Sequence, residues 1–323
     1  MDETTPGISY IVPAHNEEET IVSTVARIHN ALSDLDLEFE IIVVDDGSTD
    51  QTHERLKSCP NALLIHHPVN TGYGSAIKTG ILHAQYAWIG IVDADGTYCI
   101  EELPRLVEKM QDGFDMAIAS RTNVFLLDRP IKRLFRRMLI RFLNFVISGR
   151  IVDPNSGFRI FTKDLAMTFF PFLCNTFSFT TSITIFALGE GFFVGYVPMN
   201  YERRVGRTKV RHIRDSLRMA QLILQGVTFF NPVKFYLMLV VALVILVGIP
   251  AAVLTYFGFG TFAVHYGLIG SVSALLVGLG VLGDIVRISM TNQITKEDAK
   301  FRWKIRNRAR SRDGSVERMR IAK

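Results

Sequence analysis

The sequence has few cysteines, and their spacing fits no metal centre. Cys59, Cys99 and Cys174 are its three cysteines, and an odd number cannot all form disulfides within the chain. We therefore expect reduced thiols, as in the cytosol. The first residues, MDETTPGISY, lack a basic stretch followed by an apolar core, so no cleaved signal peptide is expected.

Charge is absent from two long segments near the C-terminus. Phe235 to Tyr256 and Phe262 to Leu282 contain no Asp, Glu, Lys or Arg, and each is long enough to cross the hydrocarbon layer as a helix. The alternative is two buried helices of a soluble domain, but such helices seldom lack charge for so long. The sequence predicts an integral membrane protein with a tight hairpin around Gly258 and Gly260.

Basic residues lie on both sides of the predicted hairpin. They favour a cytoplasmic position for both flanks and both termini. The net charge of +5 is then explained by orientation and by attraction to anionic lipid rather than by nucleic-acid binding, although the basic tail alone is compatible with either. The flanking residues are Arg203, Arg204, Arg207, Lys209, Arg211, Arg214, Arg218 and Lys234 before the hairpin, and Arg287, Lys296, Lys300, Arg302, Lys304, Arg306, Arg308 and Arg310 after it.

Short apolar runs alternate with helical patterns before the membrane segments. This alternation predicts an α/β domain with a mostly parallel sheet that is covered on both faces. The expected strands are residues 8–13, 39–45, 61–67, 88–93 and 115–120, and the expected helices are residues 17–31, 49–58, 74–84 and 100–110. The predicted organisation is a cytoplasmic domain at 1–210, an interfacial amphipathic helix at 211–231, the hairpin at 232–286 and a basic cytoplasmic tail at 287–323.

Polar clusters follow four of these strands, at the edge where such sheets bind ligands. In VDADGTY, Asp93 and Asp95 are two positions apart, so both carboxylates can point to one side of an extended chain. Paired carboxylates without nearby Cys or His suit Mg²⁺ or Mn²⁺, particularly when a substrate diphosphate supplies further oxygens. A turn is the alternative, because Asp and Gly favour turns.

The segment VVDDGSTD has the same pattern. Asp45 and Asp46 end a strand, where a carboxylate can accept hydrogen bonds from a ribose or a base. Capping of the next helix is the alternative role of the polar residues that follow. NTGYG at 70–74 offers backbone N–H groups to a phosphate, or merely turns the chain.

Taken together, the motifs resemble family 2 glycosyltransferases, and within them the dolichyl-phosphate mannose and glucose synthases. The matching segments are IVPAHNEEETI, IIVVDDGSTDQT, NTGYGSAIKTG, VDADGTY, ASR at 119–121, DPNSGFRIF at 153–161 and YERRVGRTKV at 201–210. They cover nearly all of residues 8–210 in the order of that family. The resemblance implies a nucleotide-sugar-binding (GT-A-type) domain and a UDP- or GDP-linked sugar as donor.

The resemblance also implies roles for individual residues. Pro13, Glu17 and Asp46 would hold the nucleoside, and Asp93 and Asp95 the metal and the donor. Many family members have Gln two residues after the second aspartate, whereas this chain has Thr97. This departure leaves the third metal ligand open.

The resemblance further implies a polyprenyl phosphate acceptor and residues to bind it. Arg121 and Arg136 would hold the acceptor phosphate, Arg203 or Arg204 with Lys209 would close over the diphosphate, and Asp153 would act as a base or orient an arginine. A phosphate is already largely ionised at neutral pH, so we favour orientation and expect inverting, in-line transfer.

A lipid phosphate also requires cations at the membrane surface. RPIKRLFRRMLIRFLNFVIS predicts a basic amphipathic helix that lies on a membrane, with an ordinary surface helix as the alternative. Its apolar residues Ile131, Leu134, Phe135, Met138, Phe142 and Phe145 are interrupted by Lys132, Arg133, Arg136, Arg137 and Arg141.

The sequence is also compatible with other functions. They are transfer to another lipid or glycan, or a non-catalytic membrane scaffold. A processive polysaccharide synthase is disfavoured because no Q-x-x-R-W motif is present, and a channel because the hairpin offers no polar pathway. Small residues at helical spacing predict a homo-oligomer that packs through the hairpins; they are Gly267, Ser271, Ala274 and Gly278.

Overall fold

A computed structural model describes residues 7–124, 130–147, 149–202, 224–226, 228, 232–283 and 286. The chain divides into two compact units, Met1–Gly226 and Val227–Lys323. The boundaries predicted at 210, 231 and 286 stay predictions, since most of residues 203–231 and 284–323 lie outside the described ranges. Residues 224–226 and 228, within the predicted interfacial helix, are helical.

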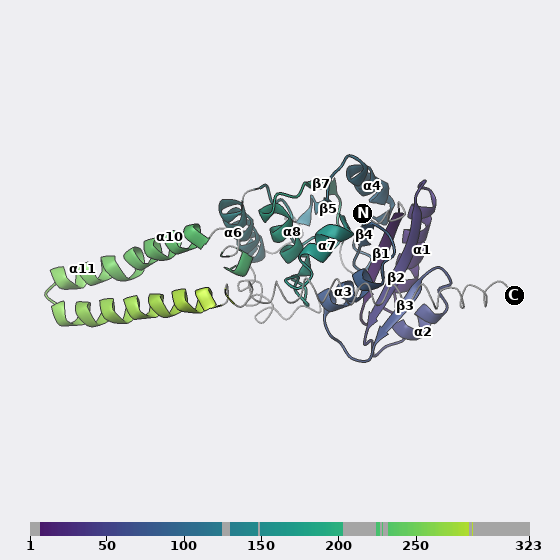
Figure 1. The fold of residues 1–323 in the computed structure, drawn as a ribbon. Helices are drawn as coiled ribbons and strands as arrows, with labels where there is room; N and C mark the ends of the chain where they lie inside the picture. Colours follow the sequence, from purple (N-terminus) through teal and green to yellow (C-terminus); the bar gives the residue numbers. More distant parts are fainter. Residues whose placement is uncertain are drawn as a thin grey trace. The chain divides into compact units, whose positions relative to one another are not determined.

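The first unit contains a seven-stranded sheet in the order β3-β2-β1-β4-β6-β5-β7 (Figure 1). Its strands are β1 (Gly7–Ala14), β2 (Glu38–Asp46), β3 (Leu63–His67), β4 (Trp88–Ile91), β5 (Met116–Arg121), β6 (Arg159–Thr162) and β7 (Val194–Met199). Neighbouring strands pair in parallel except that β6 is antiparallel to both β4 and β5. The predicted mostly parallel α/β sheet and its first five strands are confirmed.

Helices follow the strands in the predicted alternation. They are α1 (Ile21–Ser33), α2 (Thr52–Lys57), α3 (Tyr73–His83), the 3₁₀ turn η1 (Ile100–Glu102), α4 (Leu103–Gln111), α6 (Pro130–Val146), α7 (Lys163–Thr168) and α8 (Phe179–Gly189). Strands β6 and β7 were not predicted. Both are short, and VGYVPM in β7 contains a proline, which weakens a strand pattern.

The two faces of the sheet bury different side chains. Tyr10 and Val43 belong to a core shared with α1 and α4, whereas Ile11 lies against Gly80 of α3. Because successive strand residues point to opposite faces, one face carries α1 and α4 and the other α3. This alternation also separates the two aspartates at the end of β2.

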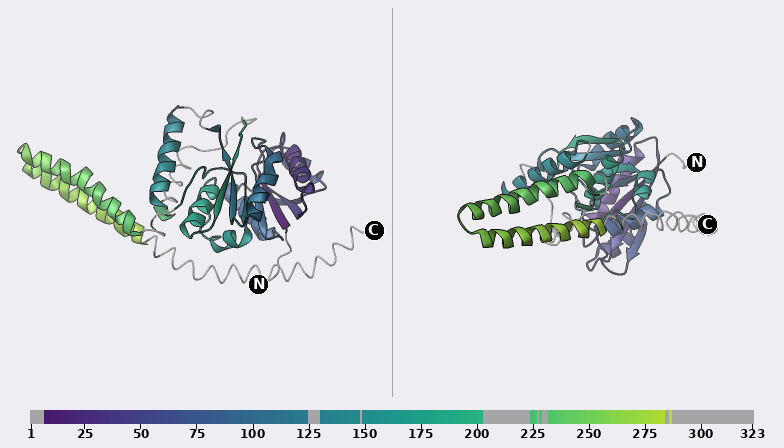
Figure 2. Two further views of the ribbon diagram at one scale, coloured as in Figure 1. Left: turned by 90° about the horizontal axis from the view of Figure 1, so that it is seen from above. Right: turned by 60° about the vertical axis from the view of Figure 1, so that its left-hand side comes forward.

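The second unit contains two helices that are long and apolar enough to cross a membrane, Pro232–Tyr256 and Gly260–Gly283. The first comprises α10 (Pro232–Leu243), the π-helical turn η2 (Val244–Gly248) and α11 (Ile249–Tyr256). The two helices lie side by side in all views (Figure 2). Tyr236 Oη donates to the Gly278 carbonyl at 3.3 Å, and Tyr266 Oη to the Leu246 carbonyl at 2.6 Å. The predicted hairpin is thus present, and Gly278 takes part in its internal packing.

Candidate functional site

The residues predicted to bind the donor sugar nucleotide and the metal begin at the ends of the parallel strands β1, β2 and β4. Pro13 is buried in β1 and pairs in register with Val44 of β2. Glu17 follows β1, where its N–H donates to Thr52 Oγ1 at 2.8 Å and its carbonyl accepts from Thr20 and Ile21 at the start of α1. The loop after β1 is therefore fastened to the start of α2.

Asp46 is buried among hydrogen-bond donors from the segment before α3. Its carboxylate accepts from the N–H groups of Thr71 (2.9 Å) and Gly72 (2.7 Å) and from Thr71 Oγ1 (2.7 Å), and it lies 2.8 Å from His67 Nδ1. Burial acts to raise the pKa of Asp46, but these hydrogen bonds outweigh it and lower the pKa. Asp46 thus fixes the NTGYG segment, whose N–H groups at 71 and 72 are directed at a carboxylate.

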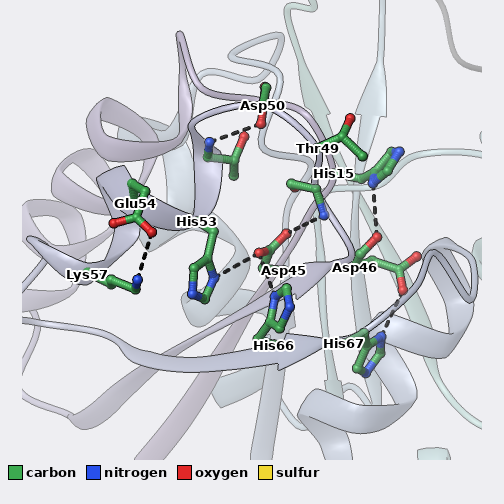
Figure 3. Close-up of polar contacts among 12 residues, drawn as sticks. His15, Asp45, Asp46, Thr49, Asp50, His53, Glu54, Lys57, His66 and His67 are labelled. Carbon is green, nitrogen blue, oxygen red and sulfur yellow. Dashed lines mark hydrogen bonds and ion pairs between the residues drawn. The ribbon is translucent and has the colours of Figure 1, made fainter.

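Asp45 has a separate set of partners (Figure 3). Its carboxylate accepts from the Ser48 N–H at 3.1 Å and lies 3.0 Å from His53 Nδ1 and 2.9 Å from His66 Nδ1. Burial acts to raise the pKa of Asp45, and the bonds from Ser48 and the two histidines lower it overall. The nucleoside-binding role predicted for Asp45 stays a prediction.

Asp93 lies between the start of α3 and the loop before β6. Tyr73 Oη donates to Asp93 Oδ1 at 2.7 Å, while the Tyr73 ring stacks on Phe177 with 5.5 Å between centroids. On the other side, Gly157 lies so close that any Cβ there would overlap the Asp93 carboxylate. The position of this carboxylate is thus set from two sides.

Asp95 is buried and held by the residue two positions further on. Thr97 donates to Asp95 Oδ1 through its hydroxyl at 2.6 Å and its N–H at 3.2 Å. Thr97 is the residue found where the resembling family often has Gln. In this chain its side chain is fully buried and orients the second aspartate.

Asp153 forms a two-pronged ion pair with Arg121. Arg121 Nε and Nη2 each donate at 2.7 Å to a different carboxylate oxygen, and the Arg121 N–H donates at 3.2 Å. Burial acts to raise the pKa of Asp153. The hydrogen bonds and the charge of Arg121 act in the opposite direction, as does the charge of Arg136, and overall they lower the pKa. Arg121 thus pairs directly with Asp153, and the charge of Arg136 also favours the ionised form of Asp153. The shared phosphate site predicted for Arg121 and Arg136 stays a prediction.

The loop that carries Asp153 and Gly157 is built on a fully buried arginine. Arg159 donates to the carbonyls of Pro154, Ser156 and Thr180 and to Thr184 Oγ1. Burial lowers the pKa of Arg159, and the donated bonds compensate for the lost hydration. The guanidinium thus anchors the 153–158 loop to α8.

Two tyrosines connect the aspartates to the ion pair. Tyr98 Oη accepts from the Gly157 N–H at 2.7 Å, and the Tyr98 ring meets the Tyr201 ring edge-on. The Arg121 guanidinium lies 5.2 Å from the centre of the Tyr201 ring. Burial raises the pKa of Tyr201, Asp95 and Asp93 add to the rise, and Arg121 opposes it. The Asp93–Asp95 pair and the Arg121–Asp153 ion pair therefore both border the Tyr98–Tyr201 pair.

Arg203, Arg204 and Lys209 lie outside the described residues. Glu202, immediately before them, donates its N–H to the Thr97 carbonyl at 2.9 Å.

Sequence reasoning missed Tyr73, Gly157, Arg159, Tyr98 and Tyr201. Each belongs to one of the motif segments, so the motif itself was the available signal. Their contacts join residues far apart in the chain, which local patterns do not reveal.

The sequence profile of the family described as glycosyl transferase family 2 matches residues 9–170. The chain belongs to glycosyl transferase family 2. The matched range includes Asp45, Asp46, Asp93, Asp95, Arg121 and Asp153. This family membership makes the chain a glycosyltransferase.

Two curated relatives are similar over most of the chain. One is the low-salt glycan biosynthesis hexosyltransferase Agl6 of Haloferax volcanii, 27% identical over 84% of this chain and 65% of the relative. The other is the undecaprenyl-phosphate 4-deoxy-4-formamido-L-arabinose transferase of Yersinia pestis, 28% identical over 88% of this chain and 90% of the relative. The chain thus spans less than two thirds of the first relative and most of the second.

Solved structures share the fold of this glycosyltransferase. The glucosyl-3-phosphoglycerate synthase of Mycobacterium tuberculosis in complex with Mn²⁺, UDP-glucose and phosphoglyceric acid superposes with a TM-score of 0.54 at 22% identity, covering 69% of this chain and 79% of that one. Its complex with Mg²⁺ and UDP gives 0.55 at 21% identity, with 69% and 78% covered. At this identity the likeness establishes the fold alone.

Proposed function

We propose that the chain transfers a sugar, with inversion, from a nucleoside-diphosphate sugar to a polyprenyl phosphate at the cytoplasmic face of a membrane. One observation carries the proposal. Tyr98 follows Thr97, which holds Asp95, and accepts from Gly157, which lies against Asp93; its ring partner Tyr201 lies against Arg121 of the Arg121–Asp153 pair. The same family 2 chain also has two membrane-length helices. The undecaprenyl phosphate named for the Yersinia relative supports the same acceptor class.

The donor is proposed to lie along the ends of β1, β2 and β4. Pro13, Glu17 and Asp46 would define the nucleoside end, with Asp45 behind them. Asp93 and Asp95 would face the diphosphate, where hydroxyl and N–H donors hold both carboxylates in place. Arg203 and Arg204 follow Glu202 directly in the chain, so we assign them with Lys209 to the leaving diphosphate.

The donor set at Asp93 and Asp95 fits a hard divalent cation, Mg²⁺ or Mn²⁺. The observation that supports this fit is a pair of oriented carboxylates just after β4, with Asp95 buried and Asp93 half-buried. Gly157 lies against the Asp93 carboxylate, where a larger residue would overlap it. When bound, such a cation supplies charge neutralisation for the diphosphate.

The acceptor phosphate is proposed to bind Arg121 and Arg136. Arg121 is held by Asp153, so its guanidinium needs no reorganisation when the phosphate arrives. Asp153 is ionised at neutral pH, since its pKa is lowered, and both of its carboxylate oxygens already accept hydrogen bonds from Arg121. We therefore assign Asp153 to orientation rather than to proton transfer.

The surface of α6 supports an acceptor that arrives from a membrane. Leu134, Phe135, Met138, Phe142 and Phe145 are exposed, while Leu143 is fully buried and anchors the helix. The exposed apolar residues alternate with arginines, a pattern that suits the boundary between headgroups and acyl chains. Ile131 and Lys132 belong to the predicted pattern, but their side chains lie outside the described ones.

The reaction follows from this placement. A phosphate oxygen of the lipid attacks the anomeric carbon, the new C–O bond forms, and the bond to the nucleoside diphosphate breaks with its electron pair leaving on the diphosphate oxygen. A phosphate with a second pKa of about 6 needs little help to ionise. The protein's contribution is alignment and charge stabilisation.

The test is transfer of radiolabelled sugar from a panel of UDP- and GDP-sugars into extractable lipid. Purified full-length protein is mixed with polyprenyl phosphate and Mg²⁺ or Mn²⁺, and a polyprenyl alcohol serves as a matched acceptor without phosphate. Label in the phosphate lipid alone, from one donor, supports the proposal. Label in neither lipid, although a nucleotide sugar binds, contradicts the acceptor assignment.

A further inference from the structure

A second group of potential metal ligands lies at the end of β2 (Figure 3). Asp45 is the second-last residue of β2, His53 belongs to α2 and His66 to β3. The two Nδ1 atoms approach the same oxygen, Asp45 Oδ2, at 3.0 and 2.9 Å, and one ligand atom from each residue lies within 4.8 Å of the others. The three side chains thus converge on one point.

Apart from Asp45, this group shares no residue with the proposed donor site, and it lies on the opposite face of the sheet from Asp46. Strands β2 and β3 pair in register, with Asp45 opposite His66 and Asp46 opposite His67. Because successive residues face opposite sides, the two Asp–His pairs lie on opposite faces of the sheet. His67 Nε2 lies 3.0 Å from Thr79 Oγ1 in α3, whereas the other pair meets His53 of α2.

We propose that Asp45, His53 and His66 bind a divalent transition-metal ion, with Zn²⁺ as the main candidate. Two imidazoles with one carboxylate suit Zn²⁺ and its neighbours better than Mg²⁺, which prefers oxygen ligands. Bonds of about 2.0–2.2 Å in a tetrahedron place ligand atoms about 3.3–3.6 Å apart. The observed separations from Asp45 Oδ2, 3.0 and 2.9 Å, are shorter than that edge by a few tenths of an ångström.

The surroundings fit a site that is open to solvent on one side. The Asp45 side chain is fully buried, while those of His53 and His66 are 28% and 44% exposed. Water can therefore complete the coordination. The Ser48 N–H, which donates to Asp45 Oδ1, holds the carboxylate in its orientation.

The site is structural in this proposal, because it links three elements. The loop between β2 and α2 also contacts the loop after β1: Asn16 N–H donates to Ser48 Oγ at 3.0 Å, and Thr49 N–H donates to Asn16 Oδ1 at 2.7 Å. A metal that joins β2, α2 and β3 would therefore restrain the loops that border the proposed nucleoside site. It would act from the opposite face to Asp46.

The alternative is that the two histidines simply donate hydrogen bonds to Asp45. Isothermal titration of tag-free, full-length protein with Zn²⁺ alone separates the two cases. Saturating Mg²⁺ is kept present to compete for the carboxylates at 93 and 95. We expect one Zn²⁺ per chain, with affinity at least about tenfold lower in His53→Gln and in His66→Gln. His29→Gln is the matched control, because His29 contacts Ser33 and Phe39 instead.

The outcomes are distinct, and none depends on sugar transfer because neither donor nor lipid is present. Zinc X-ray absorption that shows two imidazole nitrogens at about 2.0–2.1 Å, reduced in each single variant, would support the proposal. Equal zinc binding by the wild type and both variants, with circular dichroism confirming that all are folded, would overturn it. Absence of binding to the folded wild type would overturn it as well.

Discussion

The proposed donor end and the proposed acceptor end both contain aspartates, but the partners of these aspartates differ. At the proposed donor end, hydroxyl or N–H groups donate to Asp93 and Asp95, and such donors orient a carboxylate without cancelling its charge. At the proposed acceptor end, Asp153 is paired with a guanidinium in two-pronged geometry. The difference indicates that the first two carboxylates are suited to hold a cation, and the third to hold an arginine.

The sharpest test of this contrast is Asp95→Asn, which keeps the shape of the side chain and removes its charge. We expect kcat for sugar transfer to fall by about 10³-fold, or about 4 kcal/mol, because cation binding and diphosphate stabilisation are both weakened. Asp36→Asn, at an exposed carboxylate of the same domain, is the control. Transfer rates within threefold of wild type would remove Asp95 from the proposed mechanism.

A second large effect is expected on stability. In Arg159→Met the carbonyls of Pro154, Ser156 and Thr180 lose their buried donor, which costs about 3 kcal/mol of unfolding free energy. Thermal unfolding in detergent should shift downward by about 6–12 °C. The exposed Arg55→Met should shift it little, and an unchanged midpoint for Arg159→Met would contradict the anchoring role.

Asp153→Asn tests orientation against proton transfer. The amide can accept only one of the two hydrogen bonds from Arg121, so we expect kcat/KM for the lipid to fall by about 30-fold, about 2 kcal/mol, with the donor KM unchanged. The shape of the pH–rate profile should stay the same. Complete loss of turnover in a folded variant that still binds the lipid would instead identify Asp153 as the base.

The same variant should alter acid stability. Because the pKa of Asp153 is lowered on folding, its ionisation stabilises the fold above the unfolded pKa of about 3.9, and this contribution is lost as pH falls through the folded pKa. Asp153→Asn should therefore lose less stability than wild type between neutral pH and about pH 3. Parallel unfolding curves from the two proteins over this range would argue against the lowered pKa.

The sequence alone could indicate the charged residues of the candidate site but not the residues that position them. Asp93 and Asp95 could be proposed because they follow a strand in a recognisable segment, whereas Arg121 and Asp153 could be proposed only because their segments resemble those of the family. The supports of these residues were not, since Tyr73 reaches Asp93 across 20 residues and Arg159 reaches Thr180 across 21. Asp45 and Asp46 are adjacent in sequence, and only the strand register separates their partners.

The smallest effect is expected from Tyr73→Phe, which removes one hydroxyl from the donor end and leaves the ring on Phe177. Asp93 then loses one oriented hydrogen bond, worth about 1 kcal/mol, so half-maximal transfer should require about fivefold more Mg²⁺ or Mn²⁺ while kcat at saturating metal stays near wild type. Tyr256→Phe, at an exposed ring in the second unit, is the matched control. If metal dependence is unchanged but kcat falls, Tyr73 acts on the sugar rather than through Asp93. The Asp93 carboxylate would then be positioned by its close contact with Gly157 rather than by the Tyr73 hydroxyl.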